Sequence, residues 1–88
     1  MTHILKVWPE FYREIEKGNK TFEIRSTKER KFKVGEMVIL KHFDPKTNIC
    51  NGETINKRIS YVLEDTQFGI KEGYAILGLK DIERNIDV

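Results

Sequence analysis

The stretch Gly18-Asn19-Lys20-Thr21-Phe22-Glu23-Ile24-Arg25 holds the change from helical to strand periodicity that decides the fold. Upstream of it, Pro9 is typical of a first helical turn, and apolar residues recur at helical spacing as far as Ile15. Gly18 can adopt the left-handed backbone conformation that ends a helix. From residue 21 onward the apolar period changes to two, as in a strand whose successive side chains face opposite ways. The sequence therefore predicts a helix over 9–17 and a strand over 21–25.

Four further segments carry strand patterns, at 3–8, 37–43, 54–63 and 74–79. Turn signals separate them at Gly35-Glu36, at 44–48 and at Asn51-Gly52. A parallel doubly wound sheet needs more helices than this order supplies. We therefore expect an α+β, mostly β fold: a small, mostly antiparallel curved sheet or partly open β-barrel, with the helix covering one opening.

Size and composition limit the class of protein further. The 88 residues suit a single domain, with a core over about 2–80 and a tail over 81–88. The longest apolar run is residues 37–40, far short of the roughly 20 residues that span a bilayer. One cysteine and two histidines argue against a structural metal site, and we expect neither metal nor cofactor. The chain reads as a cytoplasmic protein without a membrane partner.

The charge distribution favours an anionic partner. The net charge is only +2, but residues 17–46 contain nine Lys or Arg against four acids. A basic middle region suits binding of a nucleotide or of RNA phosphate. The alternative interpretation is a solvated charged surface with no ligand.

The densest polar signal lies in the opening stretch. Glu23 and Arg25 are two residues apart, so they share one face of the strand. Arg offers a planar fork for phosphate, and Glu can accept from the amino edge of a base. Strict alternation sends Lys20 to the opposite face, unless the turn after Gly18 brings it round. The alternative interpretation is an exposed strand face on which Glu23 and Arg25 only pair with each other.

The run G-x-K-x-x-E-x-R at residues 18–25 resembles the signature of ASCH (activating signal cointegrator homology) domains of the PUA superfamily. Residues 3–10, the turn at 32–36 and Phe43-Asp44-Pro45 with Gly52 are similar to a small bacterial and phage branch of unknown function. The resemblance covers roughly residues 2–80. That branch usually follows the Arg with Asn-Asp-Arg, whereas this chain has a longer and more basic loop at 26–31.

The resemblance implies a PUA-like barrel with a cleft lined by Lys20, Glu23 and Arg25, and a ligand that is RNA or a nucleotide. It also implies an alternative, because some small ASCH proteins are amidohydrolases of N4-acetylcytidine and others are described as ribonucleases. Glu23 stands where those amidohydrolases have a nucleophilic Thr, so their mechanism does not transfer. In a different hydrolase mechanism, Glu23 would be the general base and Lys20 would stabilise an oxyanion. A protein-interaction accessory factor is the third reading.

Other candidates surround this cleft. The resemblance includes His3 and Lys6, which we expect to flank it. Trp8 is expected either to pack in the core or to stack on a base. The loop after the signature strand is expected to attract phosphate without sequence preference through Lys28, Arg30, Lys31 and Lys33.

Overall fold

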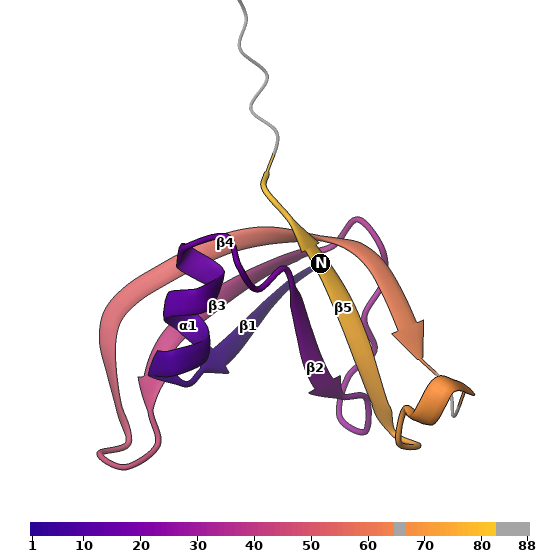
Figure 1. Ribbon diagram of the computed structural model, residues 1–88, viewed down its shortest axis with the longest axis horizontal. Helices are drawn as coiled ribbons and strands as arrows, with labels where there is room; N and C mark the ends of the chain where they lie inside the picture. Colours follow the sequence, from indigo (N-terminus) through magenta and orange to yellow (C-terminus); the bar gives the residue numbers. More distant parts are fainter. Residues whose placement is uncertain (65–66, 83–88) are drawn as a thin grey trace, which may run out of the picture.

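The computed structural model describes residues 1–64 and 67–82 (Figure 1). Its elements follow the expected order of one strand, one helix and four more strands, with a short 3₁₀ turn before the last. They are β1 (Thr2–Val7), α1 (Pro9–Glu16), β2 (Phe22–Ser26), β3 (Met37–Asp44), β4 (Ile49–Glu64), η1 (Gln67–Gly69) and β5 (Tyr74–Lys80). No helix in the described ranges is long and apolar enough to cross a membrane.

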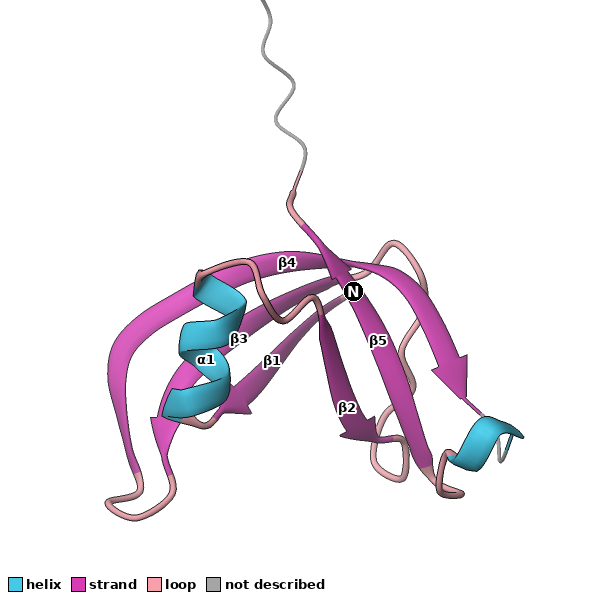
Figure 2. Cartoon of the chain, viewed as in Figure 1, coloured by secondary structure: helices cyan, strands magenta, loops and turns pink. Residues whose placement is uncertain are grey.

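The five strands form one sheet in the order β1-β3-β4-β5-β2. β1 pairs with β3 in parallel, and the other three pairings are antiparallel. The sheet curls into an open half-barrel, with the long strand β4 arching over the helix (Figure 2). Strands β1 and β2 are its two edges, since each pairs with a single neighbour. The expected mostly β fold, a curved sheet with one helix, is confirmed.

Helix α1 lies inside the curl, where it packs against β3. Pro9 occupies its first turn, as expected, because the first N–H groups of a helix have no partner within the helix and proline has no N–H. Tyr12 and Ile15 on its inner face are each 1% exposed. The inward-facing residues of four strands complete the core: Leu5, Val7, Val38, Leu40, Ile59, Ala75, Leu77 and Leu79. The helix thus fills the opening of the half-barrel with apolar side chains.

Two local expectations differ from the structure. The segment Asn51-Gly52 is not a turn but lies within β4, which begins at Ile49 rather than at residue 54. The β3–β4 register jumps here, from Lys41 opposite Thr54 to Phe43 opposite Cys50. The extra residues of β4 form a bulge, for which Gly52 supplies a positive φ of 91°. The predicted tail lies outside the described residues from position 83 onward.

Candidate functional site

The carboxylate of Glu23 lies inside the curled sheet. In the register of β2 with β5, Glu23 is opposite Leu77 and Arg25 is opposite Ala75, both fully buried. The Glu23 side chain is 7% exposed, whereas Phe22 and Ile24 face outward and are 42% and 58% exposed. The alternation of the strand is the expected one, but its polar face points inward. A buried carboxylate requires compensating partners.

Lys20 is the first partner of this carboxylate. Its Nζ donates to Glu23 Oε1 at 2.5 Å and to the backbone oxygen of Phe22 at 2.6 Å. Gly18, with a φ of 83°, ends the helix, and the backbone N–H groups of Asn19 and Lys20 both donate to Glu14. This turn places Lys20 on the side of Glu23. The expected swing of Lys20 out of the strand alternation is therefore what the structure has.

Arg25 is the second partner, and it also joins the two edges of the sheet. Its Nε donates to Glu23 Oε2 at 3.0 Å, and its Nη2 lies 2.9 Å from the same oxygen. Nη2 also donates to the backbone oxygen of Lys6 on β1 at 2.7 Å. The Arg25 side chain is 24% exposed, so it remains accessible from the seam between β1 and β2.

Two cavities open on this seam. The larger, which we call the seam cavity, has a volume of about 530 Å³; β1, β2 and the following loop line it with Ile4, Lys6, Arg25, Lys28, Arg30 and Phe32 among others. The smaller, which we call the aromatic cavity, has a volume of about 220 Å³, and its walls include Lys6, Trp8, Phe11, Glu23, Ile24 and Arg25. Lys6 and Arg25 line both, so they form the wall that separates the cavities.

Aromatic side chains surround the smaller cavity. Trp8 is 49% exposed and Phe11 is 45% exposed, so the expectation that Trp8 packs in the core is wrong. The two rings are stacked, with centroids 6.1 Å apart and planes 24° apart. The Nζ of Lys20 lies 4.8 Å from the ring of Phe22, which extends the cluster to β2. Sequence reasoning did not identify Phe11 as a site residue. The signal that could have identified it was the presence of two aromatic residues, Trp8 and Phe11, on either side of Pro9.

Of the two residues expected to flank the cleft, Lys6 lines both cavities and His3 lines neither. His3 is 3% exposed, and its Nε2 bonds Glu36 Oε1 at 2.9 Å. It packs against Phe32 and lines neither cavity, since it lies at a separate hollow with Arg30, Lys31 and Lys33. The ammonium group of Lys6 is 4.8 Å from the ring of Phe43. Lys6 therefore accepts a hydrogen bond from Arg25 through its backbone oxygen and lines both cavities, while its ammonium group lies over the ring of Phe43.

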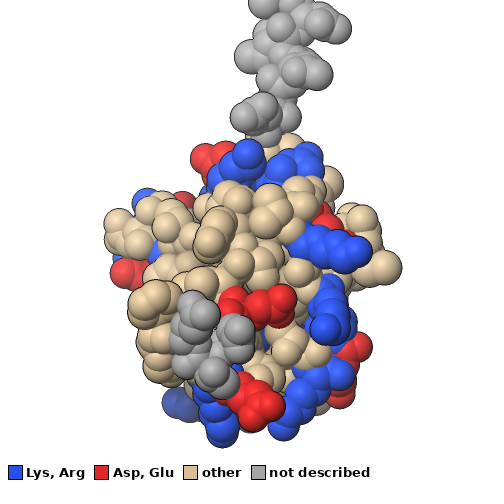
Figure 3. Space-filling model, turned by 90° about the vertical axis from the view of Figure 1, so that its right-hand side faces the viewer, with Lys and Arg blue, Asp and Glu red and all other residues tan. Residues whose placement is uncertain are grey.

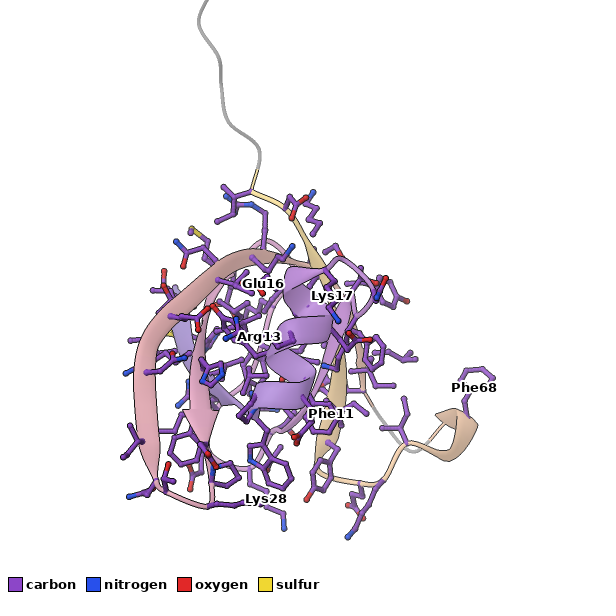
Figure 4. All side chains as sticks on the ribbon, turned by 60° about the vertical axis from the view of Figure 1, so that its left-hand side comes forward. Phe11, Arg13, Glu16, Lys17, Lys28 and Phe68 are labelled. Atoms are coloured by element: carbon purple, nitrogen blue, oxygen red, sulfur yellow. The ribbon has the colours of Figure 1, made fainter. Side chains whose placement is uncertain are left out.

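The basic loop borders the seam cavity with free cations. Lys28 and Arg30 line this cavity, and within the described part of the chain the four predicted loop cations make no salt bridge. Phe32 is 7% exposed and anchors the loop in the core. Lys28 and Phe11 lie toward the same end of the molecule in Figure 4, at the lower end of helix α1. On the side of the molecule that carries β5, Figure 3 shows Lys and Arg at the top and along the right-hand and lower margins, with Asp and Glu between them.

The arrangement is suited to recognition by hydrogen bonds and stacking. A carboxylate has about four acceptor positions, and among the described residues Lys20 uses one on Oε1 and Arg25 Nε uses one on Oε2. Oε1 therefore keeps one acceptor position, and Glu23 is among the residues that line the aromatic cavity. Among the described residues no group of three His, Cys, Asp or Glu side chains is placed to hold a metal ion.

A family model described as "Domain of unknown function (DUF3850)" matches residues 2–79, which is nearly the whole chain. The chain belongs to this family. No curated protein matches it.

Proposed function

We propose that this member of the DUF3850 family binds RNA or a nucleotide in the cleft between β1 and β2. The observation that carries the proposal is the seam cavity, whose lining has Lys6, Arg25, Lys28 and Arg30 against the single acid Glu29 and which lies beside the aromatic cavity. Cations attract the phosphate backbone of a nucleic acid. Aromatic rings can stack on its bases, and a carboxylate can accept hydrogen bonds from them. The resemblance of the chain to ASCH domains of the PUA superfamily agrees with this assignment.

The chemistry of Glu23 favours binding over hydrolysis. A general base must be free to take a proton from water or from a nucleophile. Both carboxylate oxygens of Glu23 already accept hydrogen bonds from cations, at 2.5 Å from Lys20 and 3.0 Å from Arg25. The ammonium group of Lys20 is likewise held by Glu23 and by the backbone oxygen of Phe22. A rigid, paired set of this kind presents fixed partners to a ligand.

The dependence of binding on salt tests this proposal. A variant in which Lys28, Arg30, Lys31 and Lys33 are all replaced by Gln is expected to bind RNA more weakly and with a shallower slope of log K against log salt. The control variant replaces four cations elsewhere, namely Lys41, Lys46, Lys71 and Lys80, so that both variants lose the same charge. An equal loss in both variants would contradict a role of the loop. Absence of RNA and nucleotide binding by the unaltered chain would overturn the proposal, and turnover of N4-acetylcytidine or cleavage of RNA would favour the hydrolase alternative.

A further inference from the structure

We infer that the aromatic cavity takes one unpaired nucleobase, so that the ligand of this protein is a single strand rather than a duplex. The inference rests on the proposed function and specifies which form of nucleic acid the cleft accepts. Three features of the described residues carry it: the size and walls of the cavity, the free hydrogen-bonding positions inside it, and its continuity with the cations of the seam cavity.

The size and walls of the cavity suit one planar ring. Its volume of about 220 Å³ is below the roughly 300 Å³ at which sites for drug-sized ligands begin. Trp8 and Phe11, whose half-exposed rings are stacked on each other, are among the residues that line it. Every base has an apolar π-face that stacks on such rings, whereas in a duplex this face is already covered by neighbouring bases.

The polar groups in the cavity match the edge of an unpaired base. Glu23 Oε1 has one acceptor position left after the bond from Lys20, and it can accept from the N–H of a base. Arg25 donates through Nε to Glu23 and through Nη2 to Lys6, and among the described residues its Nη1 makes no hydrogen bond, so Nη1 can donate to a base carbonyl or ring nitrogen. A donor and an acceptor side by side are what the Watson–Crick edge of a base offers, and that edge is accessible only when the base is unpaired.

The two cations on Glu23 also exclude a competing class of ligand. An aromatic cavity with a carboxylate can take a quaternary ammonium or methylated lysine group. Here Lys20 and Arg25 lie 2.5 Å and 2.9 Å from that carboxylate and already compensate its charge. A third cation would meet two like charges. A neutral base would meet none of this repulsion.

The phosphates that flank such a base would reach the seam cavity. Lys6 and Arg25 line both cavities, so the cavities are adjacent along the β1–β2 seam. Beyond this shared wall, Lys28 and Arg30 line the seam cavity and have no salt-bridge partner among the described residues. A single strand can therefore place a base against Trp8 and its backbone against the loop.

Trp8 provides the test, because it is the only tryptophan of the chain. Its fluorescence is titrated with a mixed-sequence single-stranded RNA, with the same RNA as a duplex, and with an abasic single strand of equal length and charge. We expect the single strand alone to quench Trp8. Trp8→Ala should lower its affinity roughly 5- to 100-fold, the loss expected for one stacked base, and leave the salt slope unchanged. Tyr61→Ala is the matched control, since Tyr61 is an aromatic residue of β4 that is 63% exposed and lines neither cavity.

The outcomes separate this inference from the proposed function. Salt-dependent binding that treats the single strand, the duplex and the abasic strand alike would overturn the inference and leave the proposed function standing. Absence of binding to all three and to free nucleotides would overturn both. If Trp8→Ala loses the circular dichroism of the folded chain, Trp8→Leu replaces it, which keeps apolar bulk but removes the stacking ring; unchanged affinity in that variant would count against the inference.

Discussion

The guanidinium of Arg25 on β2 donates a hydrogen bond of 2.7 Å to the backbone oxygen of Lys6 on β1. These strands are the two edges of the sheet, and they are the farthest apart in its order of pairing. The bond thus bridges the seam that backbone pairing leaves open. Glu23 Oε2 accepts from Nε of the same guanidinium at 3.0 Å, so the site and the closure of the half-barrel depend on one side chain.

Arg25→Lys is expected to lower the free energy of unfolding by roughly 1–3 kcal/mol, the cost of leaving the buried Glu23 carboxylate without one of its hydrogen bonds. Lys keeps the positive charge, but its single ammonium group cannot reproduce the fork that spans Glu23 and Lys6. Urea denaturation followed by circular dichroism measures the change. Lys28→Arg on the adjacent loop is the control, and an unchanged midpoint for Arg25→Lys would show that the seam contributes nothing to stability.

Replacing each of the two histidines by Phe is expected to change the free energy of unfolding in opposite directions. Nδ1 of His42 is buried and has no hydrogen-bond partner among the described residues, while its ring packs edge-on against Tyr12. His42→Phe removes the unpaired nitrogen and should raise the free energy of unfolding by about 1 kcal/mol. His3 bonds Glu36 at 2.9 Å, so His3→Phe should lower it by roughly 1–3 kcal/mol. Denaturation of both variants at neutral pH measures this, and a shift of the same sign in both would contradict the assignment.

Acid is expected to weaken the attachment of the helix to β4. Arg13 donates to both carboxylate oxygens of Glu53 at 2.7 Å, and it lies on the helix as labelled in Figure 4. These bonds, with a smaller contribution from Asn51, lower the pKa of Glu53 from 4.5 to about 2. Because the pKa in the folded state is the lower one, the stabilisation is present above pH 4.5 and is lost as the pH falls toward 2.

Glu53→Gln should therefore flatten the dependence of unfolding free energy on pH between 4.5 and 2, as measured by urea denaturation at several pH values. Some slope will remain, because His3 and the backbone N–H of Lys33 also lower the pKa of Glu36. Arg13→Gln removes the largest cause of the lowered pKa and should give most of the same flattening, with no further flattening when Glu53 is changed to Gln as well. If the effects of Arg13→Gln and Glu53→Gln on the pH dependence were additive, the proposed coupling between Arg13 and Glu53 would be refuted.

Much of the fold followed from local signals. Pro9 and Gly18 limited the helix to within a residue of its observed end, and apolar or alternating segments between turn signals predicted all five strands. The turn predicted at Asn51-Gly52 failed because a glycine with positive φ serves a bulge as well as a hairpin. Only pairing with β3, which places Phe43 opposite Cys50, decides between the two.

The candidate site was predictable in its residues but not in its surroundings. The spacing of Glu23 and Arg25 placed them on one face, and Gly18 allowed Lys20 to join them. Trp8 was assigned to the core or to stacking, because an aromatic residue beside a strand end suits both. His3 was expected at the cleft, but its pairing with Glu36, 33 positions away, holds it elsewhere.

The sequence by itself determined the alternation of β2, in which Glu23 and Arg25 share one face while Phe22 and Ile24 share the other. It did not determine which face is buried, and hydrophobicity alone would bury the phenylalanine and isoleucine. The tertiary structure decided otherwise, because the curl of the sheet turns the Glu23 face toward Leu77 and Ala75 of the interior. A carboxylate is stable there only with its charge compensated, and Lys20 from the helix end and Arg25 from the strand reach it together only once the chain has folded.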